Sequence, residues 1–369
     1  MTKRKFLKWV LGGMTALLAP SAGLAFAAFR EFGHLPTSED LERYKNLPYF
    51  VNGRFKGAED LPFYAARVRG GGVGWARFAL PNTHAPASAL PKTVLDRSSF
   101  AGVPSGFAAY WLGHSTLIME IDGKRLLVDP VFGNAAPVPG IVRRYDEPPL
   151  KREHLPPLDY VLITHDHYDH LEYPTMRALR DTKTRFIVPL GVDRHLMEWG
   201  IPADRITALG WGESCRQNGL AVTAEPTIHY AGRIPKDRNS TLWASYVIKG
   251  QSRRLFISGD TGYGAHFRTT GAKHGPFDAA FIEIDGWNPG WPKTHLFPEE
   301  VIKAYRDLGA KSLIPVHWGV FDLALHPWDE SITMLADLSA KAGDVRLQTP
   351  LRGEKFVPGE TQTREWWKL

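Results

Sequence analysis

One short segment of the chain concentrates side chains that bind metal ions. Residues 164–170 read Thr-His-Asp-His-Tyr-Asp-His and follow directly on the apolar run 160–163. Imidazole nitrogens and carboxylate oxygens are the ligands that zinc and other first-row divalent metals prefer. Burying so many polar groups at the end of a strand costs free energy unless a partner satisfies them. The segment therefore predicts a metal site, in which a bound cation is that partner.

Other polar residues follow predicted strands elsewhere in the chain. They are Asp129 after the run 126–128, His229 after 220–224, Asp260 after 255–257 and His317 after 312–316. Proteins of the α/β class usually place their sites where several strands end. We therefore expect these four residues to meet the histidine-rich segment at one edge of the fold.

The elements that would position these residues are short strands and helices from residue 108 onward. We predict strands at 108–112, 116–121, 126–128, 160–163, 185–188, 220–224, 243–248, 255–257, 279–284 and 312–316. We predict helices at 173–180, 192–199 and 298–308. Asp122 and Gly123 are expected to form a hairpin turn between two of the strands. Two blocks of strands with helices outside them indicate a layered α/β fold.

The N-terminal region predicts targeting or anchoring of the protein. Lys3, Arg4 and Lys5 precede an apolar stretch over 6–29, which fits a cleavable signal peptide or an uncleaved membrane anchor. Both alternatives place the body of the protein outside the cytoplasm, either exported to the periplasm or cell envelope or anchored in the membrane. Residues 30–105 are polar and rich in Gly and Pro, and we expect them to form an extension packed on a main domain over 106–369.

Composition and charge limit the partners and the kind of metal site. The net charge of +6 permits contact with anionic lipid or phosphate, although a solvated basic surface is an equal alternative. No basic run interleaved with aromatic residues argues for nucleic acid as a partner. Cys215 is the only cysteine, so disulfides within the chain and zinc sites built on several thiolates are excluded. Any metal ion is therefore expected to be held by His and Asp.

Five separated motifs, in order, resemble the metallo-β-lactamase superfamily. They occupy 111–116 (WLGHST), 129–132 (DPVF), 165–171 (HDHYDHL), 259–263 (GDTGY) and 316–319 (VHWG). Their details are similar to the branch of N-acylphosphatidylethanolamine-hydrolysing phospholipases D, which adjoins the ascorbate-phosphate lactonase-like hydrolases. The resemblance implies a four-layer αββα sandwich with a binuclear metal centre.

The resemblance also implies a division of the ligands between two ions. His165, His167 and His229 would bind one ion, Asp169, His170 and His317 would bind the other, and Asp260 would bridge the two. Asp129 and His114 would support these ligands without binding an ion themselves. His295 matches a pocket histidine of the family that binds phosphate or transfers a proton, with a helix-entry residue of no chemical role as the alternative.

The implied activity is zinc-dependent hydrolysis of a phosphodiester in an N-acylphosphatidylethanolamine-like phospholipid at a membrane surface. Two Zn²⁺ are the expected cofactors, with iron and manganese as alternatives because His/Asp sites accept several metals. A lactonase or small-ester hydrolase is the second interpretation, and a non-catalytic zinc-binding envelope protein is the third. Asp166 departs from the family pattern, and we expect its carboxylate either to lie beside the metals or to face solvent.

Overall fold

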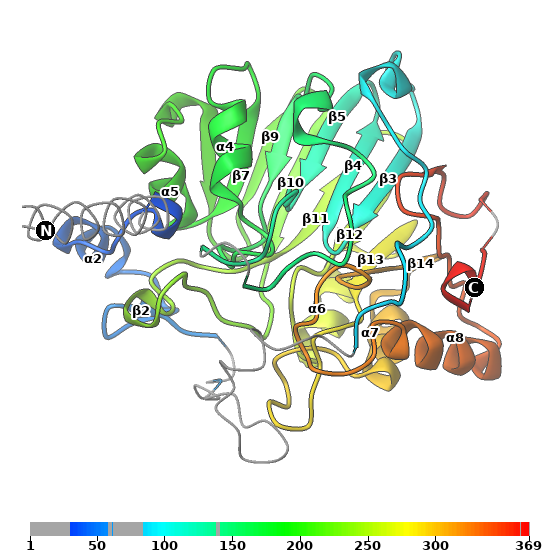
Figure 1. Cartoon of the computed structure of the whole chain (residues 1–369). Helices are drawn as coiled ribbons and strands as arrows, with labels where there is room; N and C mark the ends of the chain where they lie inside the picture. Colours follow the sequence, from blue (N-terminus) through cyan, green and yellow to red (C-terminus); the bar gives the residue numbers. More distant parts are fainter. Residues whose placement is uncertain (1–29, 58–60, 62–83, 138–140, 362, 369) are drawn as a thin grey trace, which may run out of the picture.

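The computed structural model describes residues 30–57, 61, 84–137, 141–361 and 363–368. The predicted signal or anchor over 1–29 lies outside these residues. Two β-sheets lie face to face in the middle of the molecule, and helices cover their outer sides (Figure 1). This arrangement confirms the predicted αββα sandwich.

The first sheet has seven strands in the order β15-β3-β4-β5-β6-β7-β8. In chain order these strands are β3 (Phe107–Gly113), β4 (Thr116–Ile121), β5 (Lys124–Val128), β6 (Tyr160–Leu162), β7 (Arg185–Pro189), β8 (Ile206–Leu209) and β15 (Lys355–Phe356). The hairpin between β4 and β5 turns at Asp122 and Gly123, whose φ angles of 49° and 77° suit a two-residue turn. From β5 to β8 the strands run parallel.

The second sheet has six strands in the order β14-β13-β12-β11-β10-β9. They are β9 (Ser214–Gln217), β10 (Leu220–Glu225), β11 (Ser245–Lys249), β12 (Arg254–Ile257), β13 (Ala279–Glu283) and β14 (Leu313–Val316). The strands β12, β13 and β14 are parallel. Every predicted strand occurs within about two residues of its expected bounds, whereas β8, β9 and β15 were not predicted.

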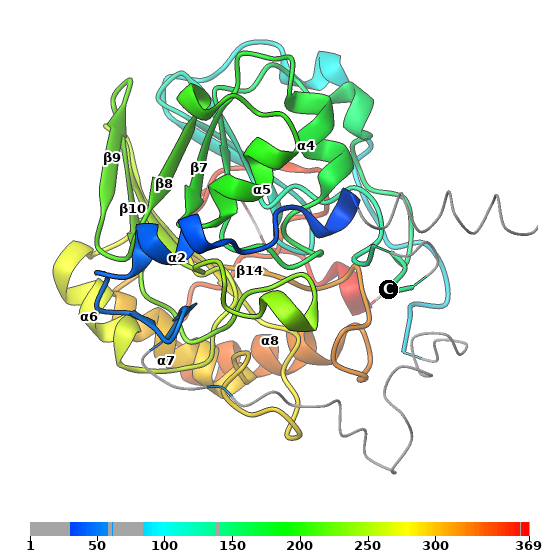
Figure 2. The same cartoon turned by 90° about the vertical axis from the view of Figure 1, so that its left-hand side faces the viewer.

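Helices form the outer two layers. The first sheet is covered by α4 (Tyr173–Leu179) and α5 (Val192–Glu198), and the second by α6 (Ala265–His274), α7 (Pro298–Leu308) and α8 (Glu330–Ala342) (Figure 2). Alternate residues of β4 show this layering, because Leu117 and Met119 join the cluster that includes Tyr246 of the second sheet, whereas Ile118 joins the cluster beneath α4 and α5. The predicted helices are therefore present, and α6 and α8 add to them.

The N-terminal segment packs on the sandwich through its aromatic residues. It contains α2 (Ser38–Tyr44), β1 (Phe50–Val51) and β2 (Arg54–Phe55). Tyr44, Phe50 and Phe55 form a buried cluster with Leu242 and Trp243. The segment therefore shares a core with the main domain. Among the described residues no helix is long and apolar enough to cross a membrane.

The strand directions bring several loops to one edge of the sandwich. Parallel strands share the direction in which they end, so the loops after β5, β6, β12, β13 and β14 meet there. These loops carry Asp129, residues 164–170, Asp260 and His317. The edge is therefore the place where the predicted metal-binding residues converge.

Candidate metal centre

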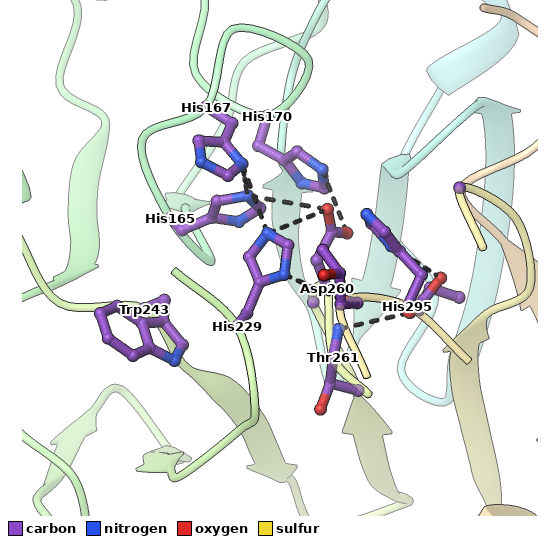
Figure 3. A network of polar contacts seen from close by, with 12 residues as sticks. His165, His167, His170, His229, Trp243, Asp260, Thr261 and His295 are labelled. Carbon is purple, nitrogen blue, oxygen red and sulfur yellow. Dashed lines mark hydrogen bonds and ion pairs between the residues drawn. The ribbon is translucent and has the colours of Figure 1, made fainter. Parts of the chain in front are cut away.

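The first group of donor atoms comes from the loop after β6 and the loop after β10. His165 Nε2 lies 2.9 Å from His167 Nδ1, which lies 3.3 Å from His229 Nε2. Asp260 Oδ2 completes the group at 3.7 Å from His165 Nε2 and 3.6 Å from His229 Nε2 (Figure 3). All four donor atoms lie within 4.8 Å of one another. The structure thus brings together the three histidines predicted to share one ion.

The second group combines a carboxylate with histidines from three loops. Asp169 Oδ2 lies 3.5 Å from both His170 Nε2 and His317 Nε2. His114 Nε2 lies 2.9 Å from the same oxygen, and donor atoms of all four residues fall within 4.8 Å of one another. The three predicted residues therefore meet, and His114 reaches the same place while holding Asp169 by a hydrogen bond.

Asp260 lies between the two groups. Its Oδ1 is 3.2 Å from His170 Nε2, and its Oδ2 is 3.2 Å from His317 Nε2, while Oδ2 also faces His165 and His229 of the first group. The carboxylate is almost completely buried. One side chain thus has contacts on both sides, as a residue that bridges two ions requires.

Two observations test whether metal ions fit these residues. His170 Nε2, Asp260 Oδ1 and both ring nitrogens of His317 are buried and have no hydrogen-bond partner, although bare polar atoms of this kind are costly. In addition, ligands that surround a zinc ion tetrahedrally at 2.0–2.1 Å lie about 3.4 Å from one another. The separations of 2.9–3.7 Å across the two groups match that spacing. The donor set therefore fits two ions.

Hydrogen bonds behind the histidines fix which nitrogen faces the centre. His170 donates its Nδ1–H to Asp129 Oδ2 at 2.8 Å, and His229 donates its Nδ1–H to the Thr294 carbonyl at 3.1 Å. Asp129 is itself held by the backbone N–H and the hydroxyl of Thr164. Such partners set the tautomer and orientation of metal-binding histidines. Asp129 therefore lies directly behind His170, and its role as a supporting residue stays a prediction.

Unusual backbone conformations mark the loops of the second group. His114, Asp129 and His317 have positive φ angles of 50°, 40° and 67°, a region that non-glycine residues adopt at a cost. The N–H of His317 donates to the carbonyl of His114, and the N–H of His114 donates to the carbonyl of Trp318. These mutual bonds hold both loops in place, so the surrounding structure maintains the strained geometry.

The charges in the two groups differ. Burial and neighbouring histidines lower the pKa of His165 well below its usual value, and burial has the same effect on His229. For His170 and His317, burial is the largest effect and opposes protonation, but the charges of Asp260 and of the other nearby carboxylates together outweigh it. Both pKa values are therefore raised, that of His317 to about 10. The histidines of the first group are therefore neutral, so Asp260 carries the only charge there. In the second group His170 and His317 stay protonated.

Asp166 points away from both groups, contrary to the two alternatives expected for it. Its side chain is fully buried and accepts hydrogen bonds from Gly232 N–H at 2.7 Å, Thr241 Oγ1 at 2.7 Å and His195 Nε2 at 3.1 Å. Burial opposes its ionisation, yet His195 holds the pKa of this carboxyl well below its usual range. Asp166 therefore anchors the back of the metal-binding loop and neither faces solvent nor joins the donors.

The N-terminal segment reaches the same loop through two residues. His195 accepts a hydrogen bond at Nδ1 from the backbone N–H of His34 at 2.9 Å. The buried guanidinium of Arg233 donates to the carbonyls of Glu31, Asp166 and Leu171 at 2.6, 2.6 and 2.9 Å. Residues 31–34 are thus linked through His195 and Arg233 to the back of the loop that carries four of the donors.

His295 lies beside the centre, on the far side of Asp260 from His165 (Figure 3). Its ring centroid is 5.2 Å from that of His229 and 5.1 Å from that of His317. Its Nδ1 is 3.3 Å from Glu283 Oε2. The sequence did not lead us to predict a role for Glu283. The available signal was that Glu283 is the single acidic residue in the otherwise apolar strand run 279–284, where a buried carboxylate needs partners.

Comparisons with known proteins agree with this geometry. A family model described as "Beta-lactamase superfamily domain" matches residues 124–318, which is more than half of the chain. An uncharacterized protein of Mycobacterium tuberculosis is 40% identical over 302 residues, covering 80% of each chain. The match therefore extends over most of both proteins.

Relatives with a named activity are more distant. An N-acyl-phosphatidylethanolamine-hydrolyzing phospholipase D of Caenorhabditis elegans is 35% identical over 233 residues, which cover 59% of this chain and 65% of that protein. A mitochondrial N-acyl-phosphatidylethanolamine-hydrolyzing phospholipase D of Saccharomyces cerevisiae is 30% identical and covers 62% of this chain and 51% of that protein. These relatives represent the branch that the motifs resemble.

Solved structures share the fold at low sequence identity. A metallo hydrolase from Ignicoccus hospitalis aligns with a TM-score of 0.53 and 19% identity, over 68% of this chain and 97% of that one. An isothiocyanate hydrolase from gut bacteria of Delia radicum aligns with a TM-score of 0.54 and 17% identity, over 68% and 98%. Fold, donor groups and relatives together show that the chain belongs to the metallo-β-lactamase superfamily of metallohydrolases, in the branch similar to the N-acylphosphatidylethanolamine-hydrolysing phospholipases D.

Proposed function

We propose that the protein hydrolyses a phosphodiester bond in N-acylphosphatidylethanolamine-like phospholipids, using two zinc ions. The observation that carries the proposal is the position of Asp260, whose two carboxylate oxygens face both donor groups at once. A carboxylate in this position could hold two ions close together, and such a pair would stabilise a displacement at phosphorus. The names of the worm and yeast relatives support a phospholipid as the substrate.

The ions would be held by the residues predicted to bind them. These are His165, His167 and His229 for one ion, Asp169, His170 and His317 for the other, and Asp260 for both. When bound, such a pair lowers the pKa of a water molecule and offsets the negative charge that develops on the phosphoryl oxygens. Nε2 of His170 and Nε2 of His317 each lie 3.2 Å from an oxygen of Asp260, and each would bind an ion in place of a proton.

Two residues of the chain would handle the protons. Asp260 lies at the middle of the centre, where its carboxylate orients the attacking water and accepts one of its protons. The remaining hydroxyl forms the new bond to phosphorus as the bond to the leaving oxygen breaks. His295 donates a proton to that oxygen, and solvent then restores the proton to His295. Asp260 releases the proton that it accepted to solvent, so both residues return to their starting state. The products are an alcohol and a phosphate monoester.

We further propose that the reaction takes place at a membrane surface outside the cytoplasm. The net charge of +6 supports contact with anionic lipid. The basic residues 3–5 and the apolar stretch over 6–29 support export or anchoring. A phospholipid substrate would then be presented where the protein is held.

The test is to identify the bond that the purified, zinc-loaded protein cleaves. Vesicles containing N-acylphosphatidylethanolamine are incubated with the protein and the products are separated by mass spectrometry. We expect phosphatidic acid and N-acylethanolamine, and no products after metal is stripped with a chelator. Hydrolysis of a lactone without any hydrolysis of phosphodiesters would favour the lactonase alternative. Two bound zinc ions without turnover of any ester would favour a structural role.

A further inference from the structure

The end of β13 supports His295 with a buried carboxylate, much as Asp129 supports His170. Glu283, the last residue of the strand, is fully buried. Its Oε2 lies 3.3 Å from His295 Nδ1, and its Oε1 accepts the backbone N–H of Leu296 at 3.0 Å. The carboxylate thus holds both the ring of His295 and the backbone immediately after it.

The same carboxylate also reaches the loop that carries Asp260. The backbone N–H of Thr261 points to Glu283 Oε1 at 3.3 Å, and the backbone N–H of Glu283 donates to Ser258 Oγ at 3.0 Å. A fully buried carboxylate is costly unless several donors satisfy it. Glu283 meets this requirement by joining the loop of Asp260 to the segment of His295.

Gly286 forms the surface against which the His295 ring lies. A Cβ atom added at Gly286 would lie 3.0 Å from three ring atoms of His295, which is tighter than most real Cβ contacts, so the ring would have to shift. The φ angle of Gly286 is 86°, a conformation that also favours glycine. The strand end therefore fixes the ring twice, by a hydrogen bond at one edge and by close packing on one face.

We propose that Glu283 is the positioning residue for His295: it accepts the Nδ1–H of the ring and leaves Nε2 to act on the leaving oxygen. This inference rests on the proposed function, because it assigns His295 its proton transfer there. A carboxylate bonded to Nδ1 fixes the orientation and the tautomer of the ring. The side chain of Glu283 thus holds His295 at a fixed position relative to the loop that carries Asp260.

A kinetic experiment distinguishes positioning from general damage. Glu283→Gln retains an oxygen for the two backbone N–H groups but replaces the acceptor at His295 with a donor. Two substrates are compared, N-acylphosphatidylethanolamine, whose alkoxide leaving group needs a proton, and bis(p-nitrophenyl) phosphate, whose phenolate leaves without one. We expect kcat for the phospholipid to fall by about 10- to 100-fold, part of the effect of a positioned proton donor, with little change for the aryl ester. Equal losses on both substrates would overturn the proposal.

A double variant tests whether Glu283 acts through His295. If it does, Glu283→Gln combined with His295→Gln is no slower on the phospholipid than His295→Gln alone. Multiplied losses would show independent roles and overturn the inference. The metal content of each variant is measured, and loss of metal in Glu283→Gln would assign the residue to the fold of the centre instead.

A matched control exists at the end of another strand. Glu225, the last residue of β10, is also buried and accepts hydrogen bonds from His274 at 2.7 Å and Lys273 at 2.8 Å. Glu225→Gln breaks a similar glutamate–histidine pair that touches none of the donors. We expect the ratio of the two kcat values to stay as in the wild type, and a change like that of Glu283→Gln would count against the proposal.

A spectroscopic measurement separates this inference from the proposed function. In metal-free, ¹⁵N-labelled protein, we expect a low-field Nδ1–H signal from His295, assigned by its absence in His295→Gln. The signal should disappear in Glu283→Gln and persist in Glu225→Gln. Its persistence in Glu283→Gln would overturn the positioning role even in an active enzyme. If the wild-type protein had no phosphodiesterase activity, the proposed function and the proton-transfer role of His295 would both be wrong. The Nδ1–H signal would still show whether Glu283 holds the ring of His295.

Discussion

The two donor groups use the same kinds of residue but carry different charge. The first has three histidines, and its only carboxylate is the shared Asp260, whereas the second adds Asp169. Burial keeps the histidines of the first group neutral, while the carboxylates keep His170 and His317 protonated in the metal-free protein. The comparison shows that the number of carboxylates decides whether an ion meets a vacant nitrogen or must displace a proton.

The two groups also depend on different parts of the chain for support. Behind the second group, Asp129 comes from the neighbouring strand end and bonds directly to His170. Behind the first, Asp166 is held by His195, and His195 by the backbone of His34. One group is therefore supported within the sandwich, and the other partly by the N-terminal segment.

Removing the residue common to both groups should have the largest effect. We expect Asp260→Ala to lower kcat by at least about 10³-fold, the scale of losing a central electrostatic contact, and to reduce the metal content of both groups. Turnover and elemental analysis measure the two effects, with Asp344→Ala on the exposed surface as the control. Near-normal turnover in a folded, fully metallated variant would contradict the bridging role.

Single-ligand variants should then separate the groups. His167→Ala is expected to remove about one ion per chain and His317→Ala the other, because each breaks one donor set. Turnover should be abolished in both variants while circular dichroism shows that the fold survives. If either variant lost both ions, the two donor groups would bind metal as one cooperative site. The conclusion that they bind their ions separately would then be wrong.

Variants of the supporting carboxylates should have intermediate and selective effects. Asp129→Asn removes the acceptor for His170, and Asp166→Asn weakens the bond to His195. Loss of such a partner typically costs about 10- to 100-fold in metal affinity. Competition with a chelator should show a weaker second group in Asp129→Asn and a weaker first group in Asp166→Asn. Identical profiles for the two variants would contradict separate support.

The smallest predicted difference concerns protons. His317 keeps its proton up to a pKa of about 10 in the metal-free protein, so an ion entering the second group must displace it at neutral pH. Affinity for that ion should therefore rise with pH towards 10, and binding should release about two protons more than at the first group, one from His170 and one from His317. Calorimetry in buffers of different ionisation enthalpy, applied to His167→Ala and His317→Ala, measures this difference.

Local patterns in the sequence predicted the strands and the convergence of the donors. One example is the apolar run 255–257, which indicates a buried strand. Asp260 follows the C-terminal end of this strand, and such ends are where sites of α/β proteins lie. The helix α6 was not predicted because Thr269, Thr270 and Gly271 disfavour helix. There tertiary packing of Phe267 compensates for weak propensity.

The supporting contacts could not be derived in this way. Asp166 stands between two donors in sequence, yet its side chain points to the opposite side of the loop. Glu283 and His295 are bonded across twelve positions of chain, and Glu283 also contacts Thr261 on a third segment. Direction and long-range pairing of this kind depend on the assembled tertiary structure, which residue type and spacing do not specify.

The bonds from Glu31 to Arg233 and from His34 to His195, two residues that hold the metal-binding loop, have a practical consequence. A recombinant version trimmed to begin after residue 34 would leave Arg233 without one carbonyl partner and His195 without its backbone donor. Poor zinc retention in so shortened a protein would then reflect a loosened loop and say little about the ligands. Biochemical work on this chain should therefore start at or before Arg30.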